Sequence, residues 1–394
     1  MYGVALEGGG TKGAYHIGAM KAIFECGFDI GAIVGTSIGS FNAAVIAQGD
    51  FEKLFEKWYN ADSSMAIDID IKELTKVNDK KIDINSLKYW YNFVSKNVSN
   101  GGIDTTKLKE LYAEYIDEEK LRKSKIEYGL VTVSLTDKKP VYIFKENIPQ
   151  GKVVDYVLAS SYLPVFKQQK LVDGKTFIDG GFYDNCPLKL LIDKKYVDIF
   201  EIRTEAIGFS RKINRKGLNI YTITPSKDLG NLLFTDNQTV RRNILMGYYD
   251  AIRVIKGYIG EEYYVIPEED SIILDKILNI TDENILDLAE NIKLSASNKH
   301  MEPKKLLFEK ILPQIGAKVS KKDTSSYQRL IVAVLEEIAT NAGIEQYKLY
   351  TFKELLKISA SYVSKEIKKE QKMLIKNDSK ILMLKFIKIL NSIK

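Results

Sequence analysis

The stretch "YGVALEGGGTKGAYHIGAMKAIFECGFDIGAIVGTSIGSFNAAVIAQG", residues 2–49, decides the fold class. "YGVAL" and "DIGAIVG" are short apolar runs typical of buried strands, and each leads through a glycine-containing turn into a helical pattern. We predict one helix from about Lys12 to Cys26, ended by Gly27, and a second in "SIGSFNAAVIAQG". The order strand, loop, helix, strand, turn, helix predicts an α/β domain with a mainly parallel sheet.

The α/β pattern continues for about 258 residues and then changes. "EYGLVTVSLTD" and "KPVYIFKE" predict two strands joined by a tight turn, and "KTFIDGGFYDN", "VDIFEIRT" and "LNIYTITPS" predict three more. From residue 259 onward amphipathic helical patterns such as "TDENILDLAENI" replace the strands. We therefore expect an α/β domain over 1–258 and an all-α domain over 259–394.

The composition is that of an ordinary globular protein. Of the 394 residues 45% are apolar and 28% charged, and no run approaches the ~18 apolar residues of a membrane span. The first residues lack the basic and apolar regions of a secretory signal. Two cysteines and two histidines suit neither a disulfide framework nor a metal cluster, so we predict no metal and no cofactor. The expected compartment is a reducing cytoplasm, although export without a signal peptide would leave no mark of this kind.

The basic charge is concentrated at the C-terminal end. Residues 365–394 hold nine lysines against three acids, a net of +6 that equals the net charge of the whole chain. Residues 1–364 are therefore balanced and do not indicate a nucleic-acid partner. Between 381 and 393 a broad apolar face lies opposite a narrow stripe with Lys385 and Lys388. This pattern suits a helix on an anionic membrane surface, giving a peripheral membrane protein, or a C-terminal helix packed in a bundle.

A candidate nucleophile lies in "IVGTSIGS". Gly35, Ser37 and Gly39 form a G-x-S-x-G motif between an apolar strand and a helix, which is the context of a nucleophile elbow. The sharp turn lifts the hydroxyl out of the sheet, and the dipole of the following helix favours developing negative charge. The alternative is a serine that merely caps the helix.

A serine hydroxyl needs an adjacent base, and the histidines are poor candidates. His16 lies inside the first helix, where packing against the sheet is expected, and His300 lies in the helical region. In "FIDGGFYDNCPL", Asp179 ends an apolar strand, and Gly180 and Gly181 allow close approach. An aspartate bonded directly to a serine can accept its proton and return it to the leaving oxygen. The alternative is an ordinary Asp-Gly turn.

The glycine triplet suits an oxyanion. The amides of Gly8, Gly9 and Gly10 precede a helix, and Lys12 adds positive charge for the oxyanion or a phosphate head group. Nucleotide binding is the competing use of such a loop. However, the stretch lacks the G-K-[ST] ending of a P-loop, and no acid follows the second strand as a dinucleotide site would require.

Taken together, "GGGTKG" at 8–13, "GTSIG" at 35–39 and "DGG" at 179–181 resemble the patatin-like phospholipase family. "AYHIGAMKAI", "ASSYLPVF" and "DNCPL" match as well, and the resemblance covers about 1–258. It implies a three-layer α/β/α fold, a dyad of Ser37 and Asp179, an oxyanion hole in the glycine loop, and calcium-independent hydrolysis of lipid acyl esters. Lys12 and Gly13 complete the glycine motif, and His16 matches a common family residue.

Residues 51–126 form a polar and aromatic insert within the α/β domain. "FEKLFEKWYN" and "SLKYWYNFVSKNV" each contain a Trp-Tyr pair. These aromatic side chains suit a lid or an acyl-binding wall near the site, or the core of a small helical cap.

The sequence therefore predicts a serine acyl hydrolase of the phospholipase A or lysophospholipase type. Two alternatives stay open: a catalytically silent lipid-binding or scaffold protein, and an esterase for soluble acyl esters. Head group, chain length, protein partner and the role of the helical region are not indicated by any motif.

Overall fold

The computed structural model of the chain describes residues 1–61, 102–292, 301–319, 322–371 and 378–393. The chain forms two compact units, Met1–Ile255 and Lys256–Lys394. No helix among the described residues is both long and apolar enough to cross a bilayer.

The first unit is built on a seven-stranded sheet in the order β4-β3-β2-β1-β6-β7, with β5 paired to β3. β1, β2, β3, β6 and β7 run parallel, whereas β4 and β5 are antiparallel to β3. The predicted mainly parallel α/β fold is confirmed. The strands are β1 (Tyr2–Leu6), β2 (Ile30–Thr36), β3 (Glu127–Ser134), β4 (Lys139–Phe144), β5 (Phe177–Asp179), β6 (Asp198–Ile202) and β7 (Asn219–Ile223).

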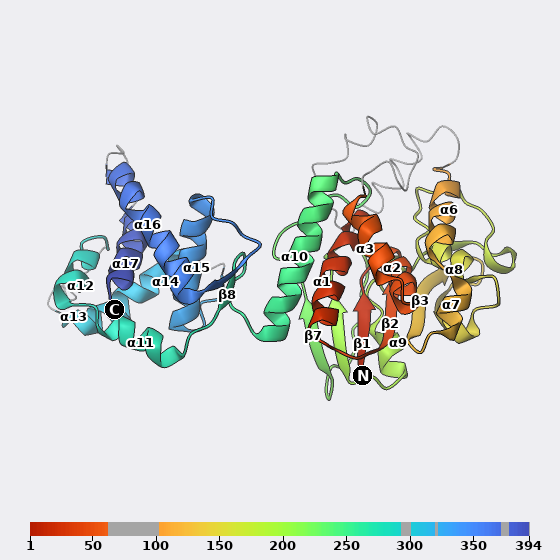
Figure 1. Cartoon of the computed structure of the whole chain (residues 1–394), viewed down its shortest axis with the longest axis horizontal. Coiled ribbons are helices and arrows are strands. Elements are labelled where there is room, and N and C mark those ends of the chain that lie inside the picture. The colour runs from red at the N-terminus through yellow and green to blue at the C-terminus, as the bar shows by residue number, and fades with distance from the viewer. Residues whose placement is uncertain (62–101, 293–300, 320–321, 372–377, 394) are drawn as a thin grey trace. The chain divides into compact units, whose positions relative to one another are not determined.

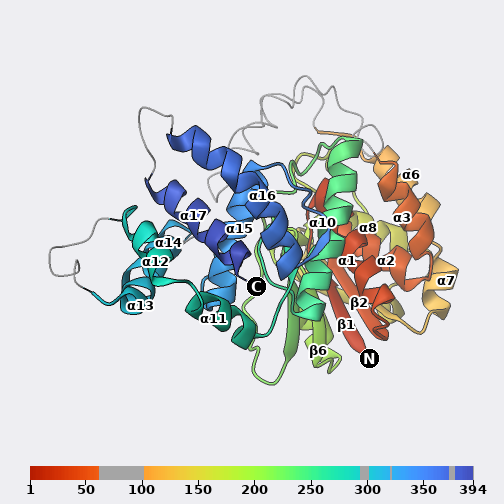
Figure 2. The same ribbon diagram turned by 60° about the vertical axis from the view of Figure 1, so that its left-hand side comes forward.

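Helices cover both faces of this sheet. Figure 1 shows α1 and α2 in front of the central strands, and α10 lies beside α1 in both ribbon views (Figures 1 and 2). α9 packs on the opposite face, where its leucines meet Ala5, Ala32 and Val34. Since both faces are covered, the central strand β2 is buried along its whole length, as expected for a parallel strand. The helices are α1 (Ala14–Glu25), α2 (Ile38–Ala47), α3 (Phe51–Tyr59), α6 (Thr106–Tyr115), α7 (Glu118–Lys123), α8 (Val153–Ser160), α9 (Leu188–Asp193) and α10 (Asn237–Lys256).

The first predicted helix differs from the structure at its start. Gly10–Gly13 form a 3-10 turn, and α1 begins only at Ala14, two residues later than predicted. Gly27 follows the helix with φ of +77°, a conformation that glycine adopts without steric cost, as the C-terminal prediction requires.

The strand order changes direction at β1. The chain passes from β1 through β2 to β3 on one side, whereas β6 and β7 lie on the other side of β1. Loops that follow two such neighbouring strands lead to opposite sides of the sheet. In parallel α/β sheets, the crevice between two such loops, at the carboxyl ends of the strands, is the usual ligand site. In this chain the glycine loop follows β1, and residues 203–218 follow β6.

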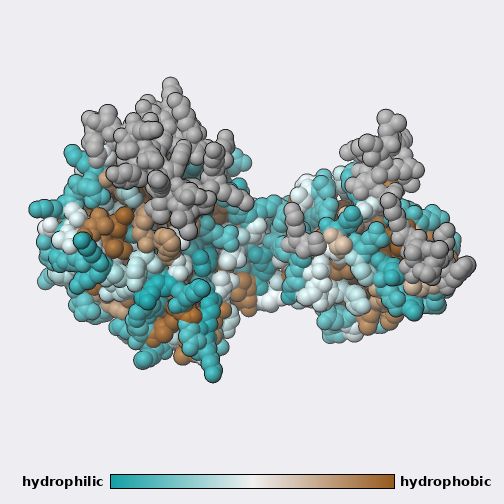
Figure 3. Space-filling view, turned by 180° about the vertical axis from the view of Figure 1, so that it is seen from behind, coloured by the Kyte–Doolittle hydropathy of each residue, from teal (hydrophilic) through white to brown (hydrophobic). Residues whose placement is uncertain are grey.

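The second unit is helical with one addition. Besides the expected helices it contains a two-stranded parallel sheet, β8 (Tyr264–Ile266) paired with β9 (Leu349–Thr351). In the space-filling view of Figure 3, hydrophilic residues cover most of the visible surface, with apolar patches between them. The helical segments are α11 (Asp270–Leu278), α12 (Asp282–Ala289), α13 (Pro303–Leu306), a π-helical turn (Leu307–Ile311), α14 (Leu312–Lys318), α15 (Tyr327–Asn341), α16 (Phe352–Gln371) and α17 (Asp378–Ser392).

The apolar face predicted between residues 381 and 393 belongs to α17 and is packed inside the second unit. The apolar face of α17, including Leu382, Phe386 and Leu390, is buried in the core of the second unit. Lys385 of α17 pairs with Asp287 of α12 at 2.6 Å. For α17 the alternative of a helix packed in a bundle holds, because an apolar face already in a core is not free to insert into lipid. Contact of the basic residues of 365–394 with an anionic membrane surface stays a prediction.

Candidate active site

Ser37 stands between β2 and α2 in a strained backbone conformation. Its φ of 54° and ψ of −128° lie outside the regions that non-glycine residues normally occupy. Such a conformation costs of order 1–3 kcal/mol and persists only where the surroundings enforce it. Ser37 occupies the N-cap position of α2, but its hydroxyl makes no capping hydrogen bond. The side chain is therefore not used as a helix cap.

Gly35 and Gly39 allow the tight turn around Ser37. A Cβ on Gly35 would lie 2.3 Å from the carbonyl carbon of Gly39, and a Cβ on Gly39 would lie 2.4 Å from the carbonyl oxygen of Leu6. Both distances are far below van der Waals contact. The helix can start this close to the sheet only because both positions lack a side chain.

The strand register brings Asp179 next to Ser37. β3 pairs with β2 up to Val131, which lies opposite Thr36, and its next residue, Thr132, lies opposite Asp179 of β5. β3 thus pairs first with β2 and then with β5, and the change of partner occurs where the chain leaves β2 for the turn at Ser37. The nucleophile candidate and the carboxylate candidate, 142 positions apart in the chain, become neighbours along β3.

The carboxylate of Asp179 is buried and has few partners. It is 4% exposed and accepts a hydrogen bond of 2.7 Å from the Gly181 amide. Burial raises the pKa of Asp179 from 3.8 to about 6, against the opposing effects of hydrogen bonds from the Ser37 side chain and the Gly181 amide. No cation forms an ion pair with it in the part of the chain that the structure describes. A carboxylate with such a pKa is a stronger base than an exposed aspartate and is still ionised at neutral pH.

Ser160 at the end of α8 holds the elbow and was not predicted. Its hydroxyl oxygen accepts a 2.9 Å hydrogen bond from the Ser37 amide, and the same hydroxyl donates to the Val131 carbonyl at 2.7 Å. The signal that could have revealed it is the pair of serines in the otherwise apolar "YVLASSYLPVF". Ser160 thus joins the elbow to the strand that also positions Asp179.

The glycine loop presents two free amides rather than three. The Gly8 amide donates to the Asn185 carbonyl at 2.9 Å, so it is already engaged. The amides of Gly9 and Gly10 have no hydrogen-bond partner among the described residues. A Cβ on Gly8 would lie 3.2 Å from the Cβ of Ser37, so the loop passes directly beside the nucleophile candidate. The half-buried Lys12 makes no side-chain ion pair within the described ranges.

Glu7, immediately before the loop, anchors it to the end of β6. The Glu7 carboxylate is 1% exposed and accepts hydrogen bonds from the amides of Thr204 at 2.6 Å and Glu205 at 2.9 Å. Arg203 forms an ion pair with it at 2.8 Å. In addition, the Thr204 hydroxyl donates to the Gly8 carbonyl at 2.6 Å. These contacts fix the backbone that carries the free amides.

His16 is a packing residue, as expected. It is fully buried, and burial lowers its pKa to about 3, so the ring is neutral. Its Nδ1 lies 3.2 Å from the amide nitrogen of Asn42, which also donates to the Gly13 carbonyl at 3.1 Å. His300 lies outside the described residues.

An apolar cavity of about 130 Å³ opens onto Ser37. Trp58 of α3 is part of its wall, and its indole N–H donates to Asn42 at 2.9 Å. Of the predicted insert, α3 and α6 therefore contribute to the cavity, whereas the second Trp-Tyr pair at 90–91 lies outside the described residues. The wall consists mainly of Ile38, Phe41, Trp58, Leu108, Leu111, Tyr112, Leu163, Phe166, Leu232 and Leu233.

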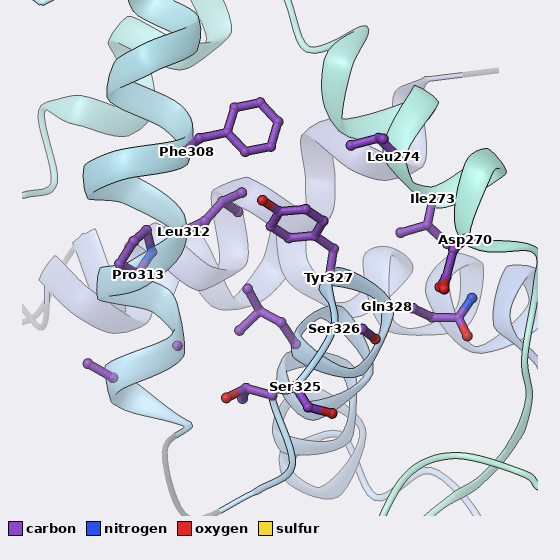
Figure 4. Close-up of a pocket in the computed structure, with 14 residues that line it drawn as sticks. Asp270, Ile273, Leu274, Phe308, Leu312, Pro313, Ser325, Ser326, Tyr327 and Gln328 are labelled. Carbon is purple, nitrogen blue, oxygen red and sulfur yellow. The ribbon is translucent and has the colours of Figure 1, made fainter.

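The second unit contains a larger hollow, of about 820 Å³, without such chemistry (Figure 4). Figure 4 shows Tyr327 at the start of α15 extending between Phe308 and Leu274. Among the described residues of its wall Asp270 is the only one with a carboxylate, and Ser326 is used as the N-cap of α15. A strained nucleophile beside a buried base is absent from the described lining, so size alone does not make this hollow the candidate site.

The N-terminal part of the chain is similar to known proteins. Residues 4–192 match the family model of patatin-like phospholipase. Over 188 residues the chain is 26% identical to human patatin-like phospholipase domain-containing protein 6, which covers 47% of this chain and 12% of that protein. Over 186 residues it is 25% identical to an uncharacterized NTE family protein of Mycobacterium tuberculosis, covering 47% of this chain and 44% of that protein.

One shorter match has a higher sequence identity. Over 46 residues the chain is 52% identical to lysophospholipase NTE1 of Coccidioides immitis, which covers 12% of this chain and 3% of that protein. The chain thus spans less than half the length of each of these relatives. Among solved structures, VipD from Legionella pneumophila aligns with 99% of this chain and 91% of its own at 14% identity and a TM-score of 0.41.

Proposed function

Because residues 4–192 match the family model of patatin-like phospholipase, we propose that the chain is a serine acyl hydrolase that cleaves carboxylic esters of membrane lipids, of the phospholipase A or lysophospholipase type. Ser37 is the nucleophile and Asp179 the base. The observation that carries the proposal is the register of β3, which pairs successive residues with Thr36 and Asp179.

The reaction begins with attack by the Ser37 hydroxyl oxygen on the ester carbonyl carbon. The Asp179 carboxylate accepts the hydroxyl proton as the new C–O bond forms. The carbonyl oxygen becomes an oxyanion, which the free amides of Gly9 and Gly10 can bind beside the elbow. Preorganised donors of this kind are each worth roughly 3 kcal/mol of transition-state stabilisation.

Collapse of the tetrahedral intermediate breaks the bond to the alcohol oxygen. The protonated Asp179 returns its proton to that oxygen, and the alcohol leaves while the acyl group stays on Ser37. A water molecule then attacks the acyl-enzyme, again losing its proton to Asp179, and the fatty acid departs as Ser37 regains a proton. The apolar cavity suits the hydrocarbon part of the acyl group.

The strained elbow argues against a silent binding protein. Backbone strain at Ser37 and a buried, weakly partnered carboxylate both lower stability, and a pure binding module has no use for them. An esterase for soluble substrates would have the same dyad. A comparison of soluble and lipid substrates is therefore needed to separate the two activities.

The test is hydrolysis of a short soluble ester, of phospholipid and of lysophospholipid, with the released products identified by mass. Ser37→Ala should lower the rate roughly 10⁴-fold or more, as loss of the nucleophile does in serine hydrolases. Ser325→Ala in the second unit, an exposed serine, is the matched control and should keep full activity. Full activity of Ser37→Ala would refute the proposal, and hydrolysis of the soluble ester alone would support the esterase alternative.

A further inference from the structure

The segment that follows β6 exposes large apolar side chains beside the candidate site. Ile207 is 50% exposed and Phe209 is 47% exposed, although side chains of this kind are usually buried. Tyr183, on the loop after Asp179, is 36% exposed. These three residues, together with Arg211 and Lys212, are called the rim patch below.

Hydrogen bonds tie the rim patch to the loop that carries Asp179. The Phe209 amide donates to the Gly181 carbonyl at 2.8 Å, and the Asn185 amide donates to the Phe209 carbonyl at 2.6 Å. Arg211 lies over the Tyr183 ring, 5.5 Å from its centroid, and its amide donates to Asp184 at 3.3 Å. The backbone under the patch is therefore held in place, while the apolar side chains project from it.

The same segment is tied to the glycine loop. The amides of Thr204 and Glu205 donate to Glu7, and a Cβ on Gly9 would lie 3.3 Å from the Cβ of Ala206. The rim patch thus follows directly on the residues that hold the free amides. A ligand seated on the patch lies next to both halves of the proposed catalytic centre.

The charge of the segment is mainly positive. Residues 205–216, "EAIGFSRKINRK", hold four basic residues and one acid, a net of +3, whereas residues 1–364 as a whole are balanced. Arg215 is partly neutralised by an ion pair with the buried Glu201 at 2.9 Å. Lys212 is exposed and makes no ion pair within the described ranges. Among the charged side chains of the patch, Arg211 and Lys212 are both positive, and Glu205 is the acid of the adjoining turn.

We propose that the rim patch is the surface by which the first unit binds an anionic lipid bilayer. Phenylalanine, isoleucine and tyrosine at the tip suit the boundary between head groups and acyl chains, and the flanking arginine and lysine suit negatively charged head groups. The purpose of this surface, which is to bring lipid esters to Ser37, rests on the proposed function. The surface itself is inferred from exposure, charge and hydrogen bonding alone.

The experiment measures binding without catalysis. The full chain carrying Ser37→Ala is sedimented with vesicles of phosphatidylcholine, with and without phosphatidylglycerol. We expect binding to the anionic vesicles that weakens at high salt, since screening shortens the range of the attraction. Ile207→Ser with Phe209→Ser should weaken binding at least tenfold, and Lys212→Glu at least fivefold, because one basic residue near an anionic surface contributes about a fivefold change in binding.

Leu286→Ser with Ile358→Ser is the matched control, because these apolar residues of the second unit are 54% and 40% exposed. That variant should bind as before, and thermal unfolding should verify that every variant is folded. The proposal is overturned by a chain that does not bind anionic vesicles, as expected if a protein covers the patch, by undiminished binding of Ile207→Ser with Phe209→Ser, or by equal loss in the control. Soluble-ester hydrolysis by the wild-type chain tests the proposed function separately.

Discussion

Each unit of the molecule buries a carboxylate, and the two are held in opposite ways. Glu336 of α15 is 1% exposed, accepts hydrogen bonds from the amides of Glu261, Glu262 and Tyr263 at 2.7–2.8 Å, and pairs with Lys322 at 2.9 Å. Asp179 has one backbone donor, one hydroxyl and no ion pair in the described part of the chain. A buried charge costs free energy unless it is fully paired. Glu336 has such partners, whereas Asp179 lacks them, as its proposed role as a base requires.

The largest effect expected from this contrast is on turnover. Asp179→Asn removes the base and should lower ester hydrolysis roughly 10⁴-fold, the order found when a catalytic carboxylate is removed from serine hydrolases. Glu336→Gln should leave hydrolysis of a short soluble ester unchanged, since the residue lies in the second unit. Steady-state kinetics of both variants checks this. Near-normal turnover by Asp179→Asn would contradict the assigned roles.

Glu336→Gln should instead lower the stability of the second unit. The substitution leaves Lys322 without its buried partner, and breaking such a pair costs about 3–5 kcal/mol. Lys322 is also bonded to Glu262 at 3.3 Å, which offsets part of the loss. Urea unfolding monitored over both units measures the change. A loss of stability confined to the first unit would contradict this prediction.

Asp179→Asn should raise stability, and only above a certain pH. The folded pKa of Asp179 is about 6 against 3.8 for the unfolded chain, so its contribution to stability is full below pH 3.8 and is lost as pH rises through 6. A shift of that size corresponds to about 3 kcal/mol at neutral pH. The variant should therefore melt several degrees higher than wild type at pH 7.5, with almost no difference at pH 3. A lower melting temperature at pH 7.5 would contradict a costly buried charge.

The smallest expected effect concerns the support of the elbow. Ser160→Ala removes the acceptor for the Ser37 amide and should lower kcat roughly tenfold, because small displacements of a nucleophile reduce catalysis. KM for a soluble ester should change little, since Ser160 does not line the cavity. Ser161→Ala is the contrasting variant, since Ser161 does line the cavity and accepts a hydrogen bond from Tyr112 at 3.0 Å. An unchanged kcat for Ser160→Ala would show that the elbow needs no such support.

The parts of the site that the sequence predicts are those set by local constraints. A glycine on each side of Ser37 and an apolar strand before it leave few other conformations, so the elbow is visible in five residues. The order of strands and helices in residues 2–49 also predicts the parallel sheet. Ser160 and the Glu7–Thr204 contact were missed because they depend on segments far apart in the chain, a helix end and strand ends, meeting in the folded protein.

The glycine triplet and the C-terminal helix illustrate two further limits. Three glycines predict three free amides, but the carbonyl of Asn185 engages one of them, which only the folded chain reveals. The sequence of an amphipathic helix indicates that one face requires an apolar partner. It does not indicate which partner, because a lipid surface and a protein core select the same pattern of apolar residues in α17. Residues of α15 and α16 supply that partner in the second unit.

The most direct test of the dyad is the rate at which a fluorophosphonate labels Ser37 as a function of pH. The reaction needs the hydroxyl and its base but no lipid, and peptide mass analysis identifies the labelled residue. We predict labelling at Ser37 that falls about tenfold per pH unit below pH 6, is constant above it, and is lost in Asp179→Asn. Labelling of Asp179→Asn at the wild-type rate, or a rate independent of pH between 4 and 8, would contradict the account.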